Sequence, residues 1–118
     1  MLNLPSNIAI LFCTEAIDMR KSFDGLIGIV RQSLKADPIS ETLFVFMNKN
    51  HNLLKILYWD RDGFAIWYKR LEQGTFTVPK PDLETNAIEI SRSQLTMILE
   101  GLEPLETRQR KRFFKKSE

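Results

Sequence analysis

The stretch from Lys55 to Phe76 constrains the fold of this chain more than any other segment. It reads KILYWDRDGFAIWYKRLEQGTF and carries both tryptophans and both tyrosines of the 118 residues. Apolar residues alternate with others on both sides of DRDG at 60–63, which is the pattern of two half-buried strands joined by a tight turn. The sequence therefore predicts an antiparallel β-hairpin.

The register of this hairpin decides which side chains share a face. We place the loop at 61–63, with Gly63 in the left-handed conformation, because this choice separates an aliphatic face from a face that mixes tryptophan with lysine. The first face then holds Leu54, Ile56, Tyr58, Phe64, Ile66 and Tyr68. The second holds Lys55, Leu57, Trp59, Ala65, Trp67 and Lys69. Indole rings between lysines indicate a surface suited to an anionic ligand with flat faces, such as unpaired nucleic acid. The alternative is that Trp59 and Trp67 are buried by packing.

Periodicity along the rest of the chain predicts an α+β protein. Strands are expected at 8–13, 43–47, 53–59, 64–70, 75–78 and 87–90. Helical spacing of apolar residues predicts one helix over 20–35 and a second after Ser91, where Gln94 completes a capping-box pattern. The predicted fold is a single domain, an antiparallel β-meander of about five or six strands with two helices packed on one face.

The charges divide the chain into a body and a tail. Residues 105–118 hold six basic and two acidic side chains, whereas the first 104 residues hold 11 basic and 13 acidic ones. We therefore expect a globular domain over 1–104 and a basic, disordered tail over 105–118. The tail either adds salt-sensitive phosphate contacts or serves as a solubilising terminus. Its candidate contacts are Arg108, Arg110, Lys111 and Arg112.

Composition predicts a cytoplasmic protein without a membrane partner. No apolar run approaches the roughly 20 residues of a membrane helix, and no secretory signal is recognisable. The single cysteine, Cys13, lies in the apolar run 8–13. A small buried side chain in a reducing compartment is the expected role of this residue.

The residues that usually carry catalysis or bind metals are sparse. One histidine and one cysteine, far apart, do not make a zinc site, and His51 lies in a polar turn. Neither a nucleophile elbow nor a phosphate-binding glycine loop is present. We expect no catalytic residue, metal, cofactor or small-molecule substrate. A lesser alternative is a magnesium-dependent nuclease, whose candidate ligands would be Asp18, Asp24, Asp60 and Asp62.

Five segments together resemble one known family. They are DMRKSFDGL at 18–26, DPIS at 37–40, LFVFMNK at 43–49, the hairpin stretch at 55–76 and ISRSQLTMILEGLE at 90–103. They are similar to the TnpB (Orf2-type) accessory proteins of bacterial insertion sequences of family sixty-six. The resemblance implies a small protein that assists transposition beside a separate transposase, which performs the strand-transfer chemistry. It supplies no catalytic residues.

The resulting hypothesis is a non-enzymatic accessory factor of transposition that binds element DNA, the transposase, or both. Basic side chains would neutralise phosphates and tryptophans would stack on exposed bases. Outside the tail, the candidate binding residues are Arg20, Lys21, Lys55, Trp59, Trp67, Lys69 and Arg70. The main alternative is a protein-interaction module without nucleic-acid binding, in which the tryptophans anchor an interface.

Overall fold

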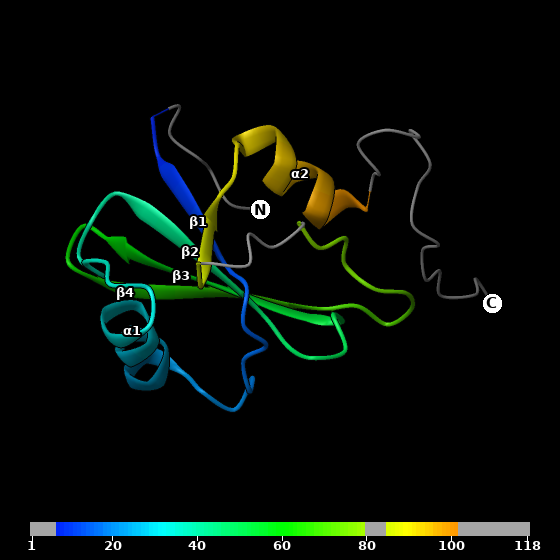
Figure 1. Ribbon diagram of the computed structural model, residues 1–118, viewed down its shortest axis with the longest axis horizontal. Coiled ribbons are helices and arrows are strands. Elements are labelled where there is room, and N and C mark those ends of the chain that lie inside the picture. Colours follow the sequence, from blue (N-terminus) through cyan, green and yellow to red (C-terminus); the bar gives the residue numbers. More distant parts are fainter. Residues whose placement is uncertain (1–6, 80–84, 102–118) are drawn as a thin grey trace.

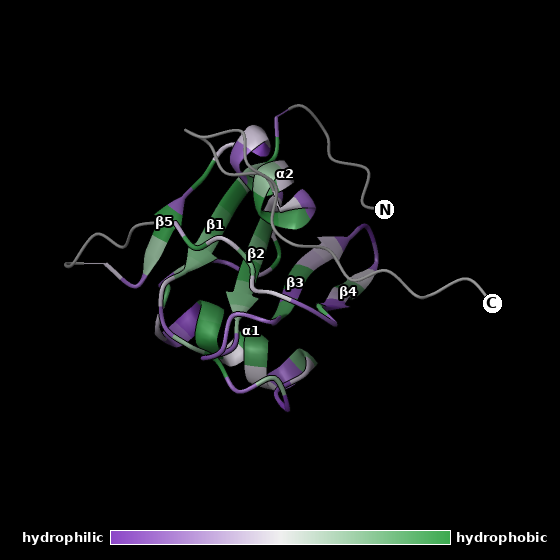
Figure 2. Ribbon diagram, turned by 90° about the vertical axis from the view of Figure 1, so that its right-hand side faces the viewer, coloured by the Kyte–Doolittle hydropathy of each residue, from purple (hydrophilic) through white to green (hydrophobic). Residues whose placement is uncertain are grey.

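The computed structural model describes residues 7–79 and 85–101, which form one five-stranded sheet with a helix on each face (Figures 1 and 2). The strands are β1 (Ala9–Cys13), β2 (Thr42–Met47), β3 (Leu53–Asp60), β4 (Gly63–Arg70) and β5 (Ala87–Glu89). The helices are α1 (Phe23–Gln32) and α2 (Arg92–Glu100). The predicted α+β class is confirmed. The predicted strand at 75–78 is not formed, although Phe76 is buried in the core.

The sheet order is β4-β3-β2-β1-β5. All neighbouring pairs are antiparallel except β1 and β2, which run parallel. The sheet is thus mostly antiparallel, as expected, but it is not a simple meander. The reason is α1, which lies between β1 and β2 in the chain and returns the chain to the end of the sheet from which β1 started.

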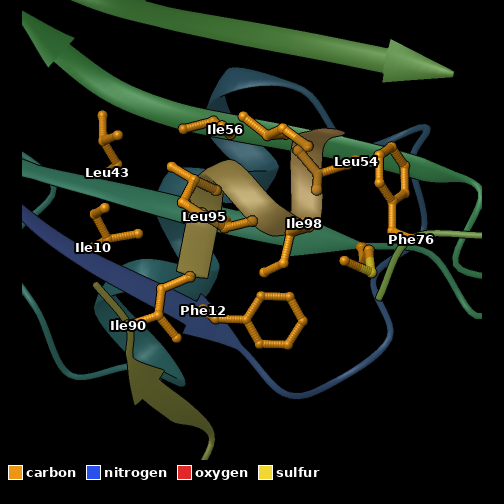
Figure 3. Close-up of a cluster of buried hydrophobic side chains, with 12 residues drawn as sticks. Ile10, Phe12, Leu43, Leu54, Ile56, Phe76, Ile90, Leu95 and Ile98 are labelled. Atoms are coloured by element: carbon orange, nitrogen blue, oxygen red, sulfur yellow. The ribbon is translucent and has the colours of Figure 1, made fainter. Parts of the chain in front are cut away.

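Each face of the sheet has its own apolar core, because successive side chains of a strand point to opposite faces. On the α2 face, residues such as Ile10, Leu43 and Ile56 pack with Leu95 and Ile98 (Figure 3). The α1 face carries a second cluster. Its buried members include Leu26, Val30, Phe44, Phe46 and Leu57. The helices therefore cover opposite faces, where the sequence led us to expect both on one face.

Local interactions set the ends of both helices. Ser91 caps α2 in the predicted capping box, since its hydroxyl accepts from the Gln94 amide at 3.1 Å and its own amide donates to the Gln94 side chain at 2.7 Å. Helix α1 is shorter than the predicted 20–35. The carboxylate of Asp18 accepts from the Arg20 amide at 2.9 Å and holds this segment in a turn instead.

The hairpin between β3 and β4 forms where it was predicted, but with a different register. Asp60 pairs with Gly63, so the loop has two residues instead of three. Arg61 takes the left-handed conformation, with φ of 57°, in place of Gly63. As a result, every residue of β4 is shifted by one place against β3, and the two predicted faces are mixed.

Candidate nucleic-acid interface

The hairpin register separates the two tryptophans. Trp67 pairs with Ile56 and packs against the α2-face core. Trp59 pairs with Phe64 on the opposite face, and their rings meet edge to face with centroids 5.0 Å apart. The prediction that Trp59 and Trp67 share one face is therefore wrong, and no joint stacking platform can be built from them.

The two lysines of the hairpin are also held by the protein. Lys69 Nζ donates to the carbonyl of Leu99 at 3.2 Å, at the end of α2. Lys55 is 6% exposed, and Lys55 Nζ donates to the carbonyls of Met19 at 2.8 Å and Lys21 at 2.7 Å. The same ammonium lies 4.7 Å from the ring centroid of Tyr68. Lys55 thus acts within the fold, as an anchor, and its charge does not reach the surface.

Lys55 anchors the loop between β1 and α1 to the sheet. This loop, residues 14–22, is also tied down by the amide of Ile17, which donates to the carbonyl of Met47 at 2.9 Å. Within the loop, the side chains of Ile17 and Met19 are buried, whereas those of Arg20 and Lys21 are exposed. The anchor at Lys55 therefore presents two cations at a fixed place on the α1 face.

Within the loop, Asp18 and Arg20 form an ion pair at the surface. Arg20 Nη2 lies 2.6 Å from Asp18 Oδ2, and the Arg20 side chain is 91% exposed. The hydrogen bonds from Arg20 lower the pKa of Asp18 to about 2, and the carboxylate in turn raises the pKa of Arg20. The pair fixes the direction of the guanidinium while leaving most of it open to solvent.

The anchored loop and the turn between β2 and β3 enclose a groove of about 630 Å³, which we call the basic groove. Its floor is apolar, and Tyr68, 51% exposed, forms part of it. Its rim carries the cations Arg20 and Lys49. The groove is lined by Ala16, Ile17, Asp18, Met19, Arg20, Asn48, Lys49, Asn50, Leu53 and Tyr68.

Further groups surround the basic groove. Arg70 pairs across the hairpin with Leu53 of the groove floor and makes an ion pair with Glu72 at 2.9 Å. Side-chain bonds between Asn48 and Asn52, with Nδ2 and Oδ1 2.7 Å apart, hold the turn that carries Lys49. An aromatic ring beside several cations can bind a base and its phosphates. Of the predicted residues, Arg20 lines the basic groove, Lys21 follows it in the anchored loop, and Arg70 lies across the hairpin from Leu53.

The sequence analysis missed Lys49 and Tyr68 as site residues. Lys49 lies in NKNHN at 48–52, whose asparagines predict a turn. A single lysine in such a turn does not by itself indicate a binding site. Tyr68 was assigned to the aliphatic face of the hairpin by the wrong register. The one available signal is that Tyr68 is flanked by basic residues in YKR at 68–70.

Comparison with protein families gives the origin of the chain. The model of the family described as IS66 Orf2 like protein matches residues 8–109. The chain belongs to this family. It is thereby an accessory protein of transposition from an insertion sequence, as the resemblance implied.

Two relatives of this family member come from Sinorhizobium fredii (strain NBRC 101917 / NGR234). The uncharacterized protein y4hO is 36% identical over 103 residues, which are 87% of this chain and 88% of y4hO. The uncharacterized protein y4jC is 30% identical over 103 residues, 87% of this chain and 86% of y4jC. No solved structure matches the chain.

The remaining predicted positions of this IS66 Orf2-like chain fall elsewhere. Arg108, Arg110, Lys111, Arg112 and the boundary after residue 104 lie outside the described residues. Asp18 lines the basic groove with Leu53 at the start of β3, and Asp24 lies in the first turn of α1. Asp60 ends β3, and Asp62 lies in the turn that follows. In ranges 7–79 and 85–101, no three potential ligands gather as a metal site would require, and neither helix is long and apolar enough to cross a bilayer.

Proposed function

We propose that this protein is a non-catalytic accessory factor that binds the DNA of its insertion sequence through the basic groove. The observation that carries the proposal is the anchor at Lys55, which holds the loop so that Arg20 lines the same groove as Lys49 and the half-exposed Tyr68. In this proposal the cations contact phosphates, and Tyr68 stacks on a base that is unpaired at a distorted element end. The protein would act in the cytoplasm beside the transposase.

The composition of the groove supports contact with a nucleic acid in preference to a metabolite. The groove is bordered by cations, and its floor offers an aromatic ring and aliphatic side chains. The exposed amide side chain of Asn50 at its rim can form hydrogen bonds with base edges or phosphate oxygens. The ion pairs of Arg20 and Arg70 with acidic neighbours lower the net charge, so we expect modest affinity.

Fluorescence anisotropy with labelled single- and double-stranded element ends tests the proposal. We expect affinity to fall steeply with salt. A variant with Arg20→Ala and Lys49→Ala should lower the slope of log affinity against log salt by about 2, one unit for each lost phosphate contact. The control is Arg31→Ala with Arg92→Ala, which makes the same change in charge at two exposed residues outside the groove. Equal effects of the two variants would contradict the proposal.

A second candidate function is binding of the transposase, as the partner protein, without DNA. It is favoured by the half-buried aromatic pair Trp59 and Phe64 on the α1 face, since aromatic side chains often anchor interfaces. A pull-down of the transposase that survives nuclease treatment and is lost on Trp59→Ala would support this alternative. Loss of the pull-down on nuclease treatment would favour DNA as the link.

A further inference from the structure

Strand β4 is the outermost strand on one side of the sheet, and no described strand pairs with its outer edge. The amide of Leu71 donates to the carbonyl of Asn52 at 2.9 Å, which fixes the alternation of hydrogen bonds along the hairpin. Every second residue of β4 therefore turns its backbone amide and carbonyl toward β3. The residues that turn these groups outward are Phe64, Ile66, Tyr68 and Arg70.

This edge lacks several of the usual protections against strand pairing, and its charged side chains are confined to Lys69 and Arg70 at the end of the strand. The strand is eight residues long, contains no proline and pairs with β3 without a bulge. In the part of the chain that the structure describes, the outward backbone groups of β4 have no partner. Proteins normally shield such an edge, because it is a template for another strand.

We propose that β4 pairs antiparallel with β4 of a second copy of this chain, with Ile66 on the two-fold axis. The two strands would form about six backbone hydrogen bonds through their outward groups. An antiparallel pair keeps side chains of the same face together, so the α1 face of each copy stays on the α1 side. A two-fold interface requires a strand that is complementary to itself, and the sequence of β4 meets this requirement.

The side chains on both faces fit this register. On the α1 face, Phe64 lies opposite Tyr68 of the second copy, and Arg70 lies opposite Asp62 of the second copy. Cross-strand aromatic pairs and opposite charges both stabilise antiparallel strands. On the α2 face, the large Trp67 lies opposite the small Ala65 of the second copy. The pairing would cover the exposed ring of Tyr68 on one side.

Other registers fit less well. A shift by two residues would place Trp67 against Trp67 of the second copy and Glu72 against Asp62 of the second copy, which puts two carboxylates together. A shift in the other direction shortens the paired segment. The distribution of charge, with Asp60 and Asp62 before β4 and Lys69 and Arg70 at its end, therefore selects the register centred on Ile66.

The first test is a charge exchange followed by sedimentation velocity on the full chain. We expect a dimer, and we expect Asp62→Arg and Arg70→Asp each to raise its dissociation constant by about tenfold, since each change puts like charges together twice per dimer. The double variant D62R/R70D should restore the dimer. A mass of one chain at every concentration, or a double variant no better than the single ones, would overturn the proposal.

The second test does not depend on charge. Directly opposite residues with outward hydrogen bonds have Cα atoms about 5.5 Å apart, which a disulfide can span. Ile66→Cys should therefore cross-link two copies under mild oxidation, while Ala65→Cys, which faces Trp67 of the second copy, should not. The natural Cys13 is 1% exposed and serves as an internal negative control. Equal cross-linking of both variants, or occupation of the edge by a transposase segment in place of a second copy, would overturn the assignment.

Discussion

At the scale of single residues, Lys55 connects the sequence with the candidate site. A buried ammonium is costly unless its hydrogen-bonding capacity is used. Here two carbonyl oxygens accept from Lys55 Nζ and the ring of Tyr68 lies beside it, so the charge is stabilised without a carboxylate. The same contacts hold the loop of residues 14–22 against the sheet. One side chain thus contributes to stability and to the shape of the basic groove.

Replacing Lys55 and, separately, the exposed Lys49 should distinguish the stability that comes from buried hydrogen bonds from any effect of losing one positive charge. We expect Lys55→Met to lower the free energy of unfolding by about 2–3 kcal/mol, because the carbonyls of Met19 and Lys21 lose their donor. Lys49→Met removes the same charge from an exposed position and should change stability by less than about 0.5 kcal/mol. Urea denaturation of both variants measures the difference. Equal stability of the two proteins would show that the buried bonds contribute little.

The ion pair between Asp18 and Arg20 predicts an unusual titration. Since the hydrogen bonds from Arg20 lower the pKa of Asp18 to about 2, the carboxylate stays ionised above pH 4. A depressed pKa in the folded state means that any stabilisation by this pair is present above the ordinary pKa of 3.8 and is lost as the pH falls through about 2. In an NMR titration, Arg20→Ala should return the Asp18 pKa toward 3.8. An unchanged pKa would contradict the pairing.

At the scale of elements, local sequence patterns predicted the presence of helices and strands better than they predicted the register of the β3–β4 hairpin. The capping box at Ser91, the apolar runs of β2 and β3 and the turn after Asp60 were readable from the sequence. The loop length was not, because a left-handed Arg61 costs only on the order of 1 kcal/mol relative to glycine, and packing on both faces outweighs that cost. The burial of Lys55 was equally unreadable, since lysine is rarely buried.

The hairpin turn offers a test of this reasoning. Arg61 has a φ of 57°, while Asp62 is not among the residues with positive φ. Arg61→Gly should therefore stabilise the protein by about 0.5–1 kcal/mol, because glycine adopts this conformation without steric cost. Asp62→Gly should destabilise it by a similar amount through backbone entropy. Thermal unfolding of the two variants distinguishes them, and opposite signs from those expected would contradict the observed loop.

The start of α2 offers a second test at this scale. Ser91→Ala removes the hydroxyl that accepts from the Gln94 amide and should cost about 1 kcal/mol of stability. Ser93→Ala, two residues further along and exposed, should be neutral or slightly stabilising because alanine favours the helix. If both variants unfold at the same denaturant concentration, the capping box does not stabilise the helix.

At the scale of the whole molecule, the basic groove depends on topology. The loop of residues 14–22 reaches the turn between β2 and β3 because β1 and β2 run parallel, so that both strands finish at the same end of the sheet. The sequence predicted an antiparallel meander, in which these segments have no reason to meet. The sequence therefore predicted Arg20 as a binding residue, but it did not predict that Arg20 would share a groove with Lys49 and Tyr68.

The most direct test of DNA binding by the groove is an NMR titration of the ¹⁵N-labelled protein with an element-end oligonucleotide. We predict that amide signals of residues 16–21, 48–50 and 68 shift on addition of DNA, while those of α2, on the other face of the sheet, do not. Raising the salt concentration should reverse the shifts. Shifts confined to α2 or to the hairpin turn, or no shifts at low salt, would contradict the account.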